Sequence, residues 1–357
     1  MSKLLTMCQD QKTSSRLSGL SISDNSSVRL NANDSVSRES FESLTALWLK
    51  SPSPLRWNCL FVLPPWLETW WKELGPEGDL CLCTVKEKDR VIGIAPLLVN
   101  KGDASFVGSD DVCDCLDFVV VPGREERFFD VLLKYLIDRG VERLNLGHLR
   151  PDSTVLTHLV GSAESRGHGV SCRTEDVSLE LALPTTWEDY LTSLSQKQRH
   201  ELRRKLRRLG EAGKVEFRVV QESGDVSEAM DTFLELFELS TAEKAGFMNL
   251  HRESFFRSLA RAMAHARLLR LGILELDEIA VAAVMCFDYD NTVHLYNSSF
   301  NPQYGSLSVG LACKILCMKD SIEKGRGKFD FLKGAEDYKY RLGGREIPLS
   351  GCEISLR

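Results

Sequence analysis

The sequence reads Thr292-Val-His-Leu-Tyr-Asn-Ser-Ser-Phe300 and then Asn301-Pro-Gln-Tyr-Gly-Ser306 at the place that decides its fold. The first segment predicts a β-strand and the second a turn of small residues. The apolar spacing over Leu307 to Lys324 predicts a helix, and Lys328 to Lys333 predicts a further strand. This order places the free N–H groups of a helix N-terminus beside a sheet, an arrangement that binds anions. The turn lacks the glycine spacing of a Walker loop or a dinucleotide-binding loop.

The residues upstream of this stretch extend it into a complete α/β unit. They predict a strand, two helices and a hairpin that leads into Thr292 to Phe300. These elements are Val215 to Val220, Val226 to Leu239, Arg252 to Ala264, Leu268 to Leu276 and Ile279 to Asp288. The second half therefore has the predicted order strand, two helices, three-stranded antiparallel meander, helix and strand.

The first half of the chain predicts a mixed sheet of related order. Its elements are two helices, a hairpin, a strand, a helix, a short strand, a helix and a closing strand. They are Phe41 to Lys50, Pro64 to Leu74, Leu80 to Val85 with Val91 to Val99, Cys115 to Val121, Arg124 to Arg139, Arg143 to Leu146, Asp152 to Arg166 and Val177 to Leu183. The two halves share no repeat in sequence, so their likeness rests on the order of elements alone.

Three C-terminal motifs resemble those of a known enzyme family. They are Tyr304-Gly-Ser-Leu-Ser-Val-Gly310, Phe329-Asp-Phe-Leu-Lys-Gly334 and Glu336-Asp-Tyr-Lys-Tyr-Arg-Leu-Gly343. Together they are similar to the signature of the CelD-like (BioF2-like) acyltransferases of the GNAT superfamily. Softer matches lie upstream, at Trp66 to Trp70, Asp114 to Phe118, Leu149 to Ser153 and Ser195 to Arg199.

The resemblance implies an α/β fold of tandem GNAT-like domains, each a mixed, mostly antiparallel sheet flanked by helices. It also implies a more distant similarity to Fem peptidyltransferases. The chain departs from the family pattern at Ala335, where an acidic residue often stands. We expect a mobile polar tail over residues 1–39, with Ser27 to Leu30 as a possible edge strand. We expect three further parts: an N-terminal domain over 40–185, a basic helical connector over 186–213, and a C-terminal domain with the donor site over 214–357.

Composition narrows the class of protein. The chain has 357 residues, a net charge of −6 and 43% hydrophobic residues, which is ordinary for a globular chain and argues against a protein built to hold nucleic acid. No apolar run approaches the roughly 20 residues that span a bilayer, and the N-terminus has no apolar signal core. The eleven cysteines form no CxxC pair, so we expect reduced thiols in the cytoplasm.

Two close cysteine pairs raise the question of a metal site. Cys81 with Cys83, and Cys113 with Cys115, would each face one side of a strand. No histidine pair or second close pair completes a ligand set, and buried cysteines commonly pack as small hydrophobes. Core packing is therefore the preferred interpretation, and no metal is expected. Cys313 and Cys317, one helical turn apart, fit a core stripe, and His294 fits a core position.

The segment Lys197 to Arg208 predicts a basic amphipathic helix, because seven of its twelve residues are Lys or Arg. A solvated helix face is the simplest interpretation. The alternative is a site for an anionic acceptor, in which candidate acceptor-binding residues are Lys197, Arg199, Arg203 and Arg204, together with Lys333 and Lys339.

The resemblance assigns donor binding to the small-residue loop. The candidate residues for acyl-CoA are Tyr304, Gly305, Ser306, Leu307, Ser308, Val309 and Gly310. Backbone N–H groups there would hold the pyrophosphate, and glycines would permit its close approach. An ordinary loop with Ser306 or Ser308 as helix cap is the alternative.

Acyl transfer also needs groups that polarise the thioester and move protons. In this superfamily a backbone N–H on a splayed strand polarises the thioester carbonyl. The corresponding N–H in this chain would lie near Asn297 or Ser298. Tyr338 and Tyr340 are candidate acids for the departing thiolate, and Glu336 and Asp337 are candidate bases. For both carboxylates, surface charge is the simpler interpretation. No Ser/His/Asp or Cys/His set indicates a covalent mechanism.

The sequence thus predicts a cytoplasmic acyl-CoA-dependent N-acyltransferase. It would transfer an acyl group, acetyl being the expected one, to a small-molecule, sugar or peptide amine, and an anionic acceptor would suit the basic helix. A Fem-like transferase that uses aminoacyl-tRNA is one alternative. A catalytically silent binding or scaffold module in polysaccharide biosynthesis is the other.

Overall fold

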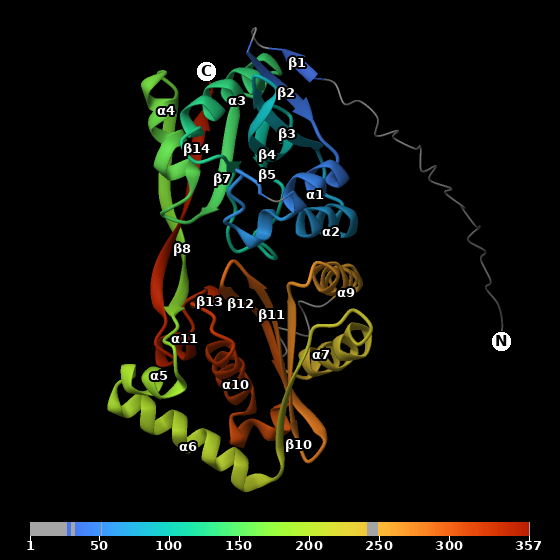
Figure 1. The fold of residues 1–357 in the computed structure, drawn as a ribbon, viewed down its shortest axis with the longest axis vertical. Helices are drawn as coiled ribbons and strands as arrows, with labels where there is room; N and C mark the ends of the chain where they lie inside the picture. Colours follow the sequence, from blue (N-terminus) through green and yellow to red (C-terminus); the bar gives the residue numbers. More distant parts are fainter. Residues whose placement is uncertain (1–26, 30–32, 51, 241–248, 357) are drawn as a thin grey trace, which may run out of the picture.

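The computed structural model describes residues 27–29, 33–50, 52–240 and 249–356. Its strands form one mixed sheet with the order β1-β2-β3-β4-β5-β7-β14-β8-β13-β12-β11-β10-β9, and β6 pairs with β4. Two long strands, β8 (Gly169–Ala182) and β14 (Arg345–Ser355), run from one half of the molecule into the other (Figure 1). They make the two halves parts of one continuous sheet.

The N-terminal half surrounds one end of this sheet. Its further elements are β1 (Ser27–Arg29), β2 (Asp34–Arg38), α1 (Phe41–Leu49), α2 (Pro64–Leu74), β3 (Asp79–Glu87), β4 (Arg90–Asn100), β5 (Asp103–Phe106), β6 (Val119–Val120), α3 (Glu125–Asp138), β7 (Arg143–Leu149), a π-helical turn η2 (Val155–Leu159) and α4 (Val160–Ser165).

The C-terminal half surrounds the other end. Its elements are α5 (Trp187–Ser193), α6 (Gln196–Ala212), β9 (Val215–Val220), α7 (Val226–Ser240), α9 (Leu250–His265), β10 (Leu269–Leu276), β11 (Ile279–Tyr289), β12 (Thr292–Phe300), the 3-10 turn η3 (Pro302–Leu307), α10 (Val309–Glu323), β13 (Lys328–Lys333) and α11 (Asp337–Arg341). This is the order predicted from the sequence, with α5 and α11 added.

The helices of the C-terminal half divide between the two faces of its sheet. Figure 1 shows α7 and α9 on one face and α10 on the other, with α6 beyond α10. Helix α9 packs on α2 of the first half, so one hydrophobic core continues across both halves. A second core lies under α5, α6 and α10 and includes Cys313 and Cys317, as the helical spacing predicts.

Strand β14 departs from the predicted division of the chain. The last strand of the sequence leaves the C-terminal half and inserts between β7 and β8 of the N-terminal half. Ile354 and Leu356 are buried in the core of that first half. The predicted C-terminal domain over 214–357 therefore includes a strand that pairs with strands of the first half.

The predicted polar tail over residues 1–39 also ends earlier than expected. Residues 1–26 lie outside the described residues, but Asp34–Arg38 is strand β2, paired with β3. Val36 is fully buried, and Asp34 forms an ion pair with Arg127 of α3. One buried valine and one ion pair with a buried aspartate are too weak a pattern to stand out in a polar sequence.

The strand predicted over Cys115 to Val121 is reduced to Val119–Val120. The residues before it form a loop at the junction of the two halves, held by a backbone hydrogen bond from Leu116 to His148 and by side chains. Both carboxylate oxygens of Asp117 accept the N–H of Thr154, at 3.1 and 2.9 Å. The loop matters because it carries Asp114 to the junction.

The cysteines are not all reduced. Cys172 of β8 and Cys352 of β14 form a disulfide, which corrects the expectation of free thiols throughout. The other eight described cysteines are free, and Cys81, Cys83 and Cys113 are buried. Within the described residues, no cluster of three or more His, Cys, Asp or Glu side chains is placed to hold a metal. None of the described helices has the length and apolar character needed to cross a membrane.

Candidate active site

Strands β12 and β13 diverge and open a cavity between them. They pair in parallel only where Thr292, Val293 and His294 face Lys328, Phe329 and Asp330. Beyond this point the strands separate around a cavity of about 500 Å³. Its lining includes β12 residues Leu295 to Ser298, so unpaired backbone of a strand edge borders the space.

A bulge in β12 lies at the mouth of this opening. The register with β11 steps from Leu295↔Cys286 to Asn297↔Met285, which leaves Tyr296 without a cross-strand partner. The Tyr296 hydroxyl donates to the carbonyl of Val112 at 3.1 Å, in the loop from the first half. The bulge is therefore fixed from the other half of the molecule.

The end of β13 is bent sharply at the cavity. Leu332 has a left-handed backbone with φ 62°, which costs about 1–3 kcal/mol for such a residue. The Asp330 carboxylate accepts the Leu332 N–H at 2.8 Å. Lys339 donates to the carbonyls of Leu332, Lys333 and Gly334, at 2.9, 2.6 and 3.0 Å. These contacts hold the strained segment in place.

The start of α10 forms the opposite wall. Of the predicted donor-binding residues, the cavity is lined by Gly305, Ser308, Val309 and Gly310. Tyr304, Ser306 and Leu307 belong to η3 and are not part of its lining. Ser308 precedes the first helical turn with φ 56°, and its hydroxyl accepts from Lys205 of α6 at 2.8 Å. Val309 and Gly310, at the start of α10, line the cavity. The first N–H groups of a helix have no i−4 carbonyl partner within it, so those of Val309 and Gly310 can serve a ligand.

Only part of the predicted proton-transfer set reaches the cavity. Tyr338 lines it, and burial raises the pKa of its hydroxyl well above the ordinary value. Glu336 also lines it and lies 2.9 Å from the Lys339 ammonium. Tyr340 instead donates to Glu346, and Asp337 is exposed and pairs with Arg341 at 3.2 Å. The geometry therefore separates Tyr338 and Glu336 from the other two.

Two titratable groups in the lining were given no role in the sequence-based predictions, although Asp114 begins one of the stretches similar to the family. Lys314 of α10 is 8% exposed, and burial lowers the pKa of its ammonium. Its Nζ lies 3.3 Å from the Gly310 carbonyl and 4.9 Å from the centre of the Tyr338 ring. Asp114 comes from the loop of the first half, and burial raises the pKa of its carboxyl. A lysine among apolar residues of one helix face was the available signal for Lys314.

The candidate acceptor residues do not form one group. Lys333 and Lys339 both line the main cavity, but the Lys339 ammonium is already occupied by the carbonyls of Leu332, Lys333 and Gly334. Lys197 lines a second cavity of about 830 Å³, which lies between α6 and α10. Leu311 borders both this cavity and the main one. Arg199, Arg203 and Arg204 line neither cavity, and Arg204 pairs with Glu201 at 2.8 Å.

The predicted core position of His294 agrees with its surroundings. Its side chain is 14% exposed, and Nδ1 lies 3.6 Å from the Asp330 carboxylate. Arg150 of the first half lies 3.7 Å from the same carboxylate and 2.7 Å from Glu180 of β8. These charges join the halves next to the cavity without lining it.

Comparison with known proteins identifies the class of this site. Residues 196–340 match the model of the acetyltransferase (GNAT) domain family. This segment contains α10, the divergent strands and Tyr338. The C-terminal half is thus a GNAT-type domain, and the protein is an enzyme of the N-acyltransferase class. No curated protein matches the chain significantly.

Solved structures share the fold at low sequence identity. FemX is 13% identical, with 89% of this chain and 96% of FemX covered and a TM-score of 0.61. A conserved protein of unknown function from Bacteroides thetaiotaomicron is 12% identical, with 90% and 99% covered and a TM-score of 0.56. L-PGS from Bacillus licheniformis is 11% identical, with 82% and 90% covered and a TM-score of 0.52. At these identities the likeness concerns the fold alone.

Proposed function

We propose that this protein transfers an acyl group, acetyl foremost, from an acyl-CoA thioester to an amine. The observation that carries the proposal is the divergence of β12 and β13 into a cavity of about 500 Å³ that ends at the start of α10. An extended thioester arm suits the space between two strands, and a pyrophosphate suits a helix N-terminus. The narrower likeness to CelD-like acyltransferases belongs to the same proposal.

The donor would enter with its pyrophosphate at the start of α10. Gly305 has open space where a side chain would stand, so a phosphate can approach the backbone there. A hydrogen bond from a backbone N–H to a charged group contributes about 1.5–3 kcal/mol. Lys205 lies next to this position through its contact with Ser308 and would add a positive charge.

The nucleotide end of the donor would occupy the second cavity, between α6 and α10. Its floor is apolar and suits a base, with Leu202, Leu311, Ile315 and Leu342. Its rim carries Lys197, Lys205 and Arg341, which suit the phosphate on the ribose. Under this proposal the basic helix binds the donor instead of the acceptor.

The acceptor amine would reach the thioester from the side of Asp114. An ammonium must lose a proton before it attacks, and a carboxylate whose pKa is raised by burial is the better base. The amine nitrogen then bonds to the thioester carbon, whose oxygen would be stabilised by the open edge of β12 at Leu295 to Ser298. As the C–S bond breaks, Tyr338 would give its proton to the departing thiolate, and its phenolate would take up the second proton that the nitrogen must lose to become the amide.

Calorimetry with acetyl-CoA tests the donor site. Gly305→Glu would place a carboxylate in the cavity, where nothing lies within 4 Å of the new Cβ. We expect micromolar binding to the unaltered chain and at least a hundredfold loss in this variant. The matched control is Gly161→Glu, on the exposed surface of α4, which also has open space around it.

The outcome also separates the alternatives. Binding of acetyl-CoA that is equal in both glutamate variants would remove the donor from this cavity. No binding to the unaltered chain, together with binding of an aminoacyl-tRNA, would favour a Fem-like transferase. Absence of both would favour a silent binding module.

A further inference from the structure

The wall of the main cavity carries a buried cation that the proposed reaction does not use. Lys314 lies among the buried side chains of helix α10, whose other members are apolar or are cysteine and serine. It follows Gly310 by four residues, so the two share one face of the helix, and both line the cavity. Lys314 is 8% exposed, and burying an ammonium is costly unless other groups replace its water.

The protein replaces little of that water. An ammonium can donate three hydrogen bonds. That of Lys314 lies 3.3 Å from the Gly310 carbonyl and 4.9 Å from the centre of the Tyr338 ring. Among the described residues, no carboxylate forms an ion pair with it. Because buried charges are normally paired, an ammonium in this state points to an anion that completes the site.

The carboxylates that line the described part of the cavity face the other two lysines. Glu336 lies 2.9 Å from the Lys339 ammonium. Asp114 accepts the backbone N–H of Lys333 at 3.4 Å. The lining therefore leaves the charge of Lys314 unbalanced.

The position of Lys314 indicates which part of a bound donor it would meet. Gly310 belongs to the first turn of α10, where the proposed donor places its pyrophosphate, and Tyr338 is where it places its thioester. The Lys314 ammonium contacts both residues, so it lies between these two ends. The pantetheine arm that joins the two ends carries no charge. A negative group at this depth must therefore belong to the acyl chain.

We propose that Lys314 selects the donor, and that the preferred donor is a dicarboxylic acyl-CoA, whose acyl chain ends in a free carboxylate. This carboxylate pairs with the Lys314 ammonium and takes no part in the transfer, which proceeds at the thioester carbon as described. The inference rests on the proposed acyl transfer and narrows its donor. Acetyl-CoA fits the same cavity but leaves the charge of Lys314 unpaired.

Calorimetry on the full chain with succinyl-CoA and butyryl-CoA tests the proposal, because the two acyl chains have the same carbon skeleton and differ in the terminal carboxylate. We expect succinyl-CoA to bind at least tenfold more tightly than butyryl-CoA. Lys314→Met keeps a long side chain without its charge and should reduce this ratio to about one. The matched control is Lys319→Met, at a half-exposed position of the same helix outside the cavity, which should keep the ratio.

The unaltered chain alone can overturn the inference, so the test does not depend on the folding of a variant. Equal affinity for the two thioesters, or a preference for butyryl-CoA, would contradict it. A preference for succinyl-CoA that survives in Lys314→Met, or in Lys314→Gln if the methionine variant does not fold, would assign the carboxylate to another cation and also contradict it.

The same titrations separate this inference from the proposed function. Binding of butyryl-CoA and acetyl-CoA without any preference for succinyl-CoA shows that the role of Lys314 alone is wrong. Binding of none of the three thioesters removes the proposed function as well.

Discussion

Tyr338 is the residue on which the chemistry of the proposed reaction depends most directly. Its hydroxyl is kept protonated by burial, and its ring lines the cavity beside Lys314. Removing the hydroxyl with Tyr338→Phe keeps the ring and should lower kcat about 10²–10⁴-fold, as loss of a general acid typically does. Melting temperature and acetyl-CoA affinity should change little. Turnover of the first accepted amine is the measurement.

Tyr340 supplies the control for that experiment. Its hydroxyl points to Glu346 and away from the cavity, so Tyr340→Phe should retain near-full turnover. A large loss in Tyr340→Phe with full activity in Tyr338→Phe would reverse the assignment.

The proposed role of Asp114 as the base predicts how activity depends on pH. As the base, its carboxyl must be deprotonated, and burial raises its pKa above the ordinary value of about 3.9. Activity should therefore fall, as pH decreases, at a higher pH than an ordinary aspartate would give. Asp114→Asn should remove this acid limb of kcat/KM and lower kcat about 10²–10⁴-fold. An acid limb that persists in Asp114→Asn would assign the titration to another group.

Single residues of the site were only partly predictable from the sequence. Tyr338 and Glu336 stood in a recognisable motif, and both line the cavity. Lys339, in the same motif, was taken for an acceptor ligand, but its ammonium holds the end of β13. Local sequence does not show which carbonyls a lysine will meet when Leu332 turns left-handed.

At the scale of an element, the proposed role of helix α6 in donor binding can be tested by reversing charges in its groove. If its groove with α10 holds the nucleotide end of CoA, Lys197→Glu combined with Arg341→Glu should weaken CoA binding about tenfold or more. Pantetheine binding should remain unchanged, because pantetheine lacks the nucleotide. The loss should shrink at high salt, which screens exposed charges.

The same helix provides the matched control. Arg207→Glu with Arg208→Glu makes the same change of charge on exposed residues outside the groove. Calorimetry on both double variants decides the point, and an equal effect of the two would indicate a general charge effect rather than a nucleotide site.

Elements with strong periodicity were predicted well, and those fixed by distant partners were not. The strand predicted over Thr292 to Phe300 is β12, and the helix predicted over Leu307 to Lys324 is α10, which spans Val309–Glu323. Strand β14 was missed, although it is long, because Pro348 and Gly351 weaken a strand pattern. Its place between β7 and β8 depends on edges formed nearly two hundred residues earlier.

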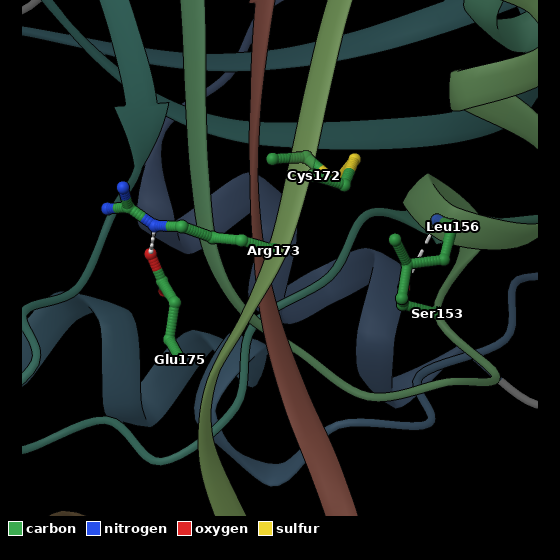
Figure 2. Close-up of a disulfide and its surroundings, with 6 residues drawn as sticks. Ser153, Leu156, Cys172, Arg173 and Glu175 are labelled. Carbon is green, nitrogen blue, oxygen red and sulfur yellow. Dashed lines mark hydrogen bonds and ion pairs between the residues drawn. A yellow bond between two sulfur atoms is a disulfide. The ribbon is translucent and has the colours of Figure 1, made fainter.

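At the scale of the whole molecule, the disulfide joins β8 and β14, the two strands that lead into and out of the C-terminal half (Figure 2). Cys172 and Cys352 are 180 residues apart, and the entire GNAT-type segment lies between them. In the chain-entropy account, closing a loop of this length stabilises the fold by up to about 5 kcal/mol. Reduction, or Cys172→Ser, should therefore lower the melting temperature by several degrees.

A reductant provides the control for this prediction. It should lower the melting temperature of the unaltered chain and have no further effect on Cys172→Ser. If both proteins respond equally to the reductant, the effect comes from another pair of cysteines, such as Cys59 and Cys115 with sulfurs 3.3 Å apart.

The continuity of the two halves could not have been predicted from composition or element order. A tandem arrangement implies two separate cores, whereas one core runs through α2 and α9 and one sheet runs through β8 and β14. This joining brings Asp114 from the first half to the cavity of the second.

The position of bound acyl-CoA tests the central claim most directly. A crystal structure of the protein with acetyl-CoA should show the pantetheine arm between β12 and β13, the pyrophosphate at Ser308 to Gly310 and the thioester near Tyr338. Coenzyme A bound elsewhere, or a cavity that stays empty at millimolar acetyl-CoA, would contradict the account.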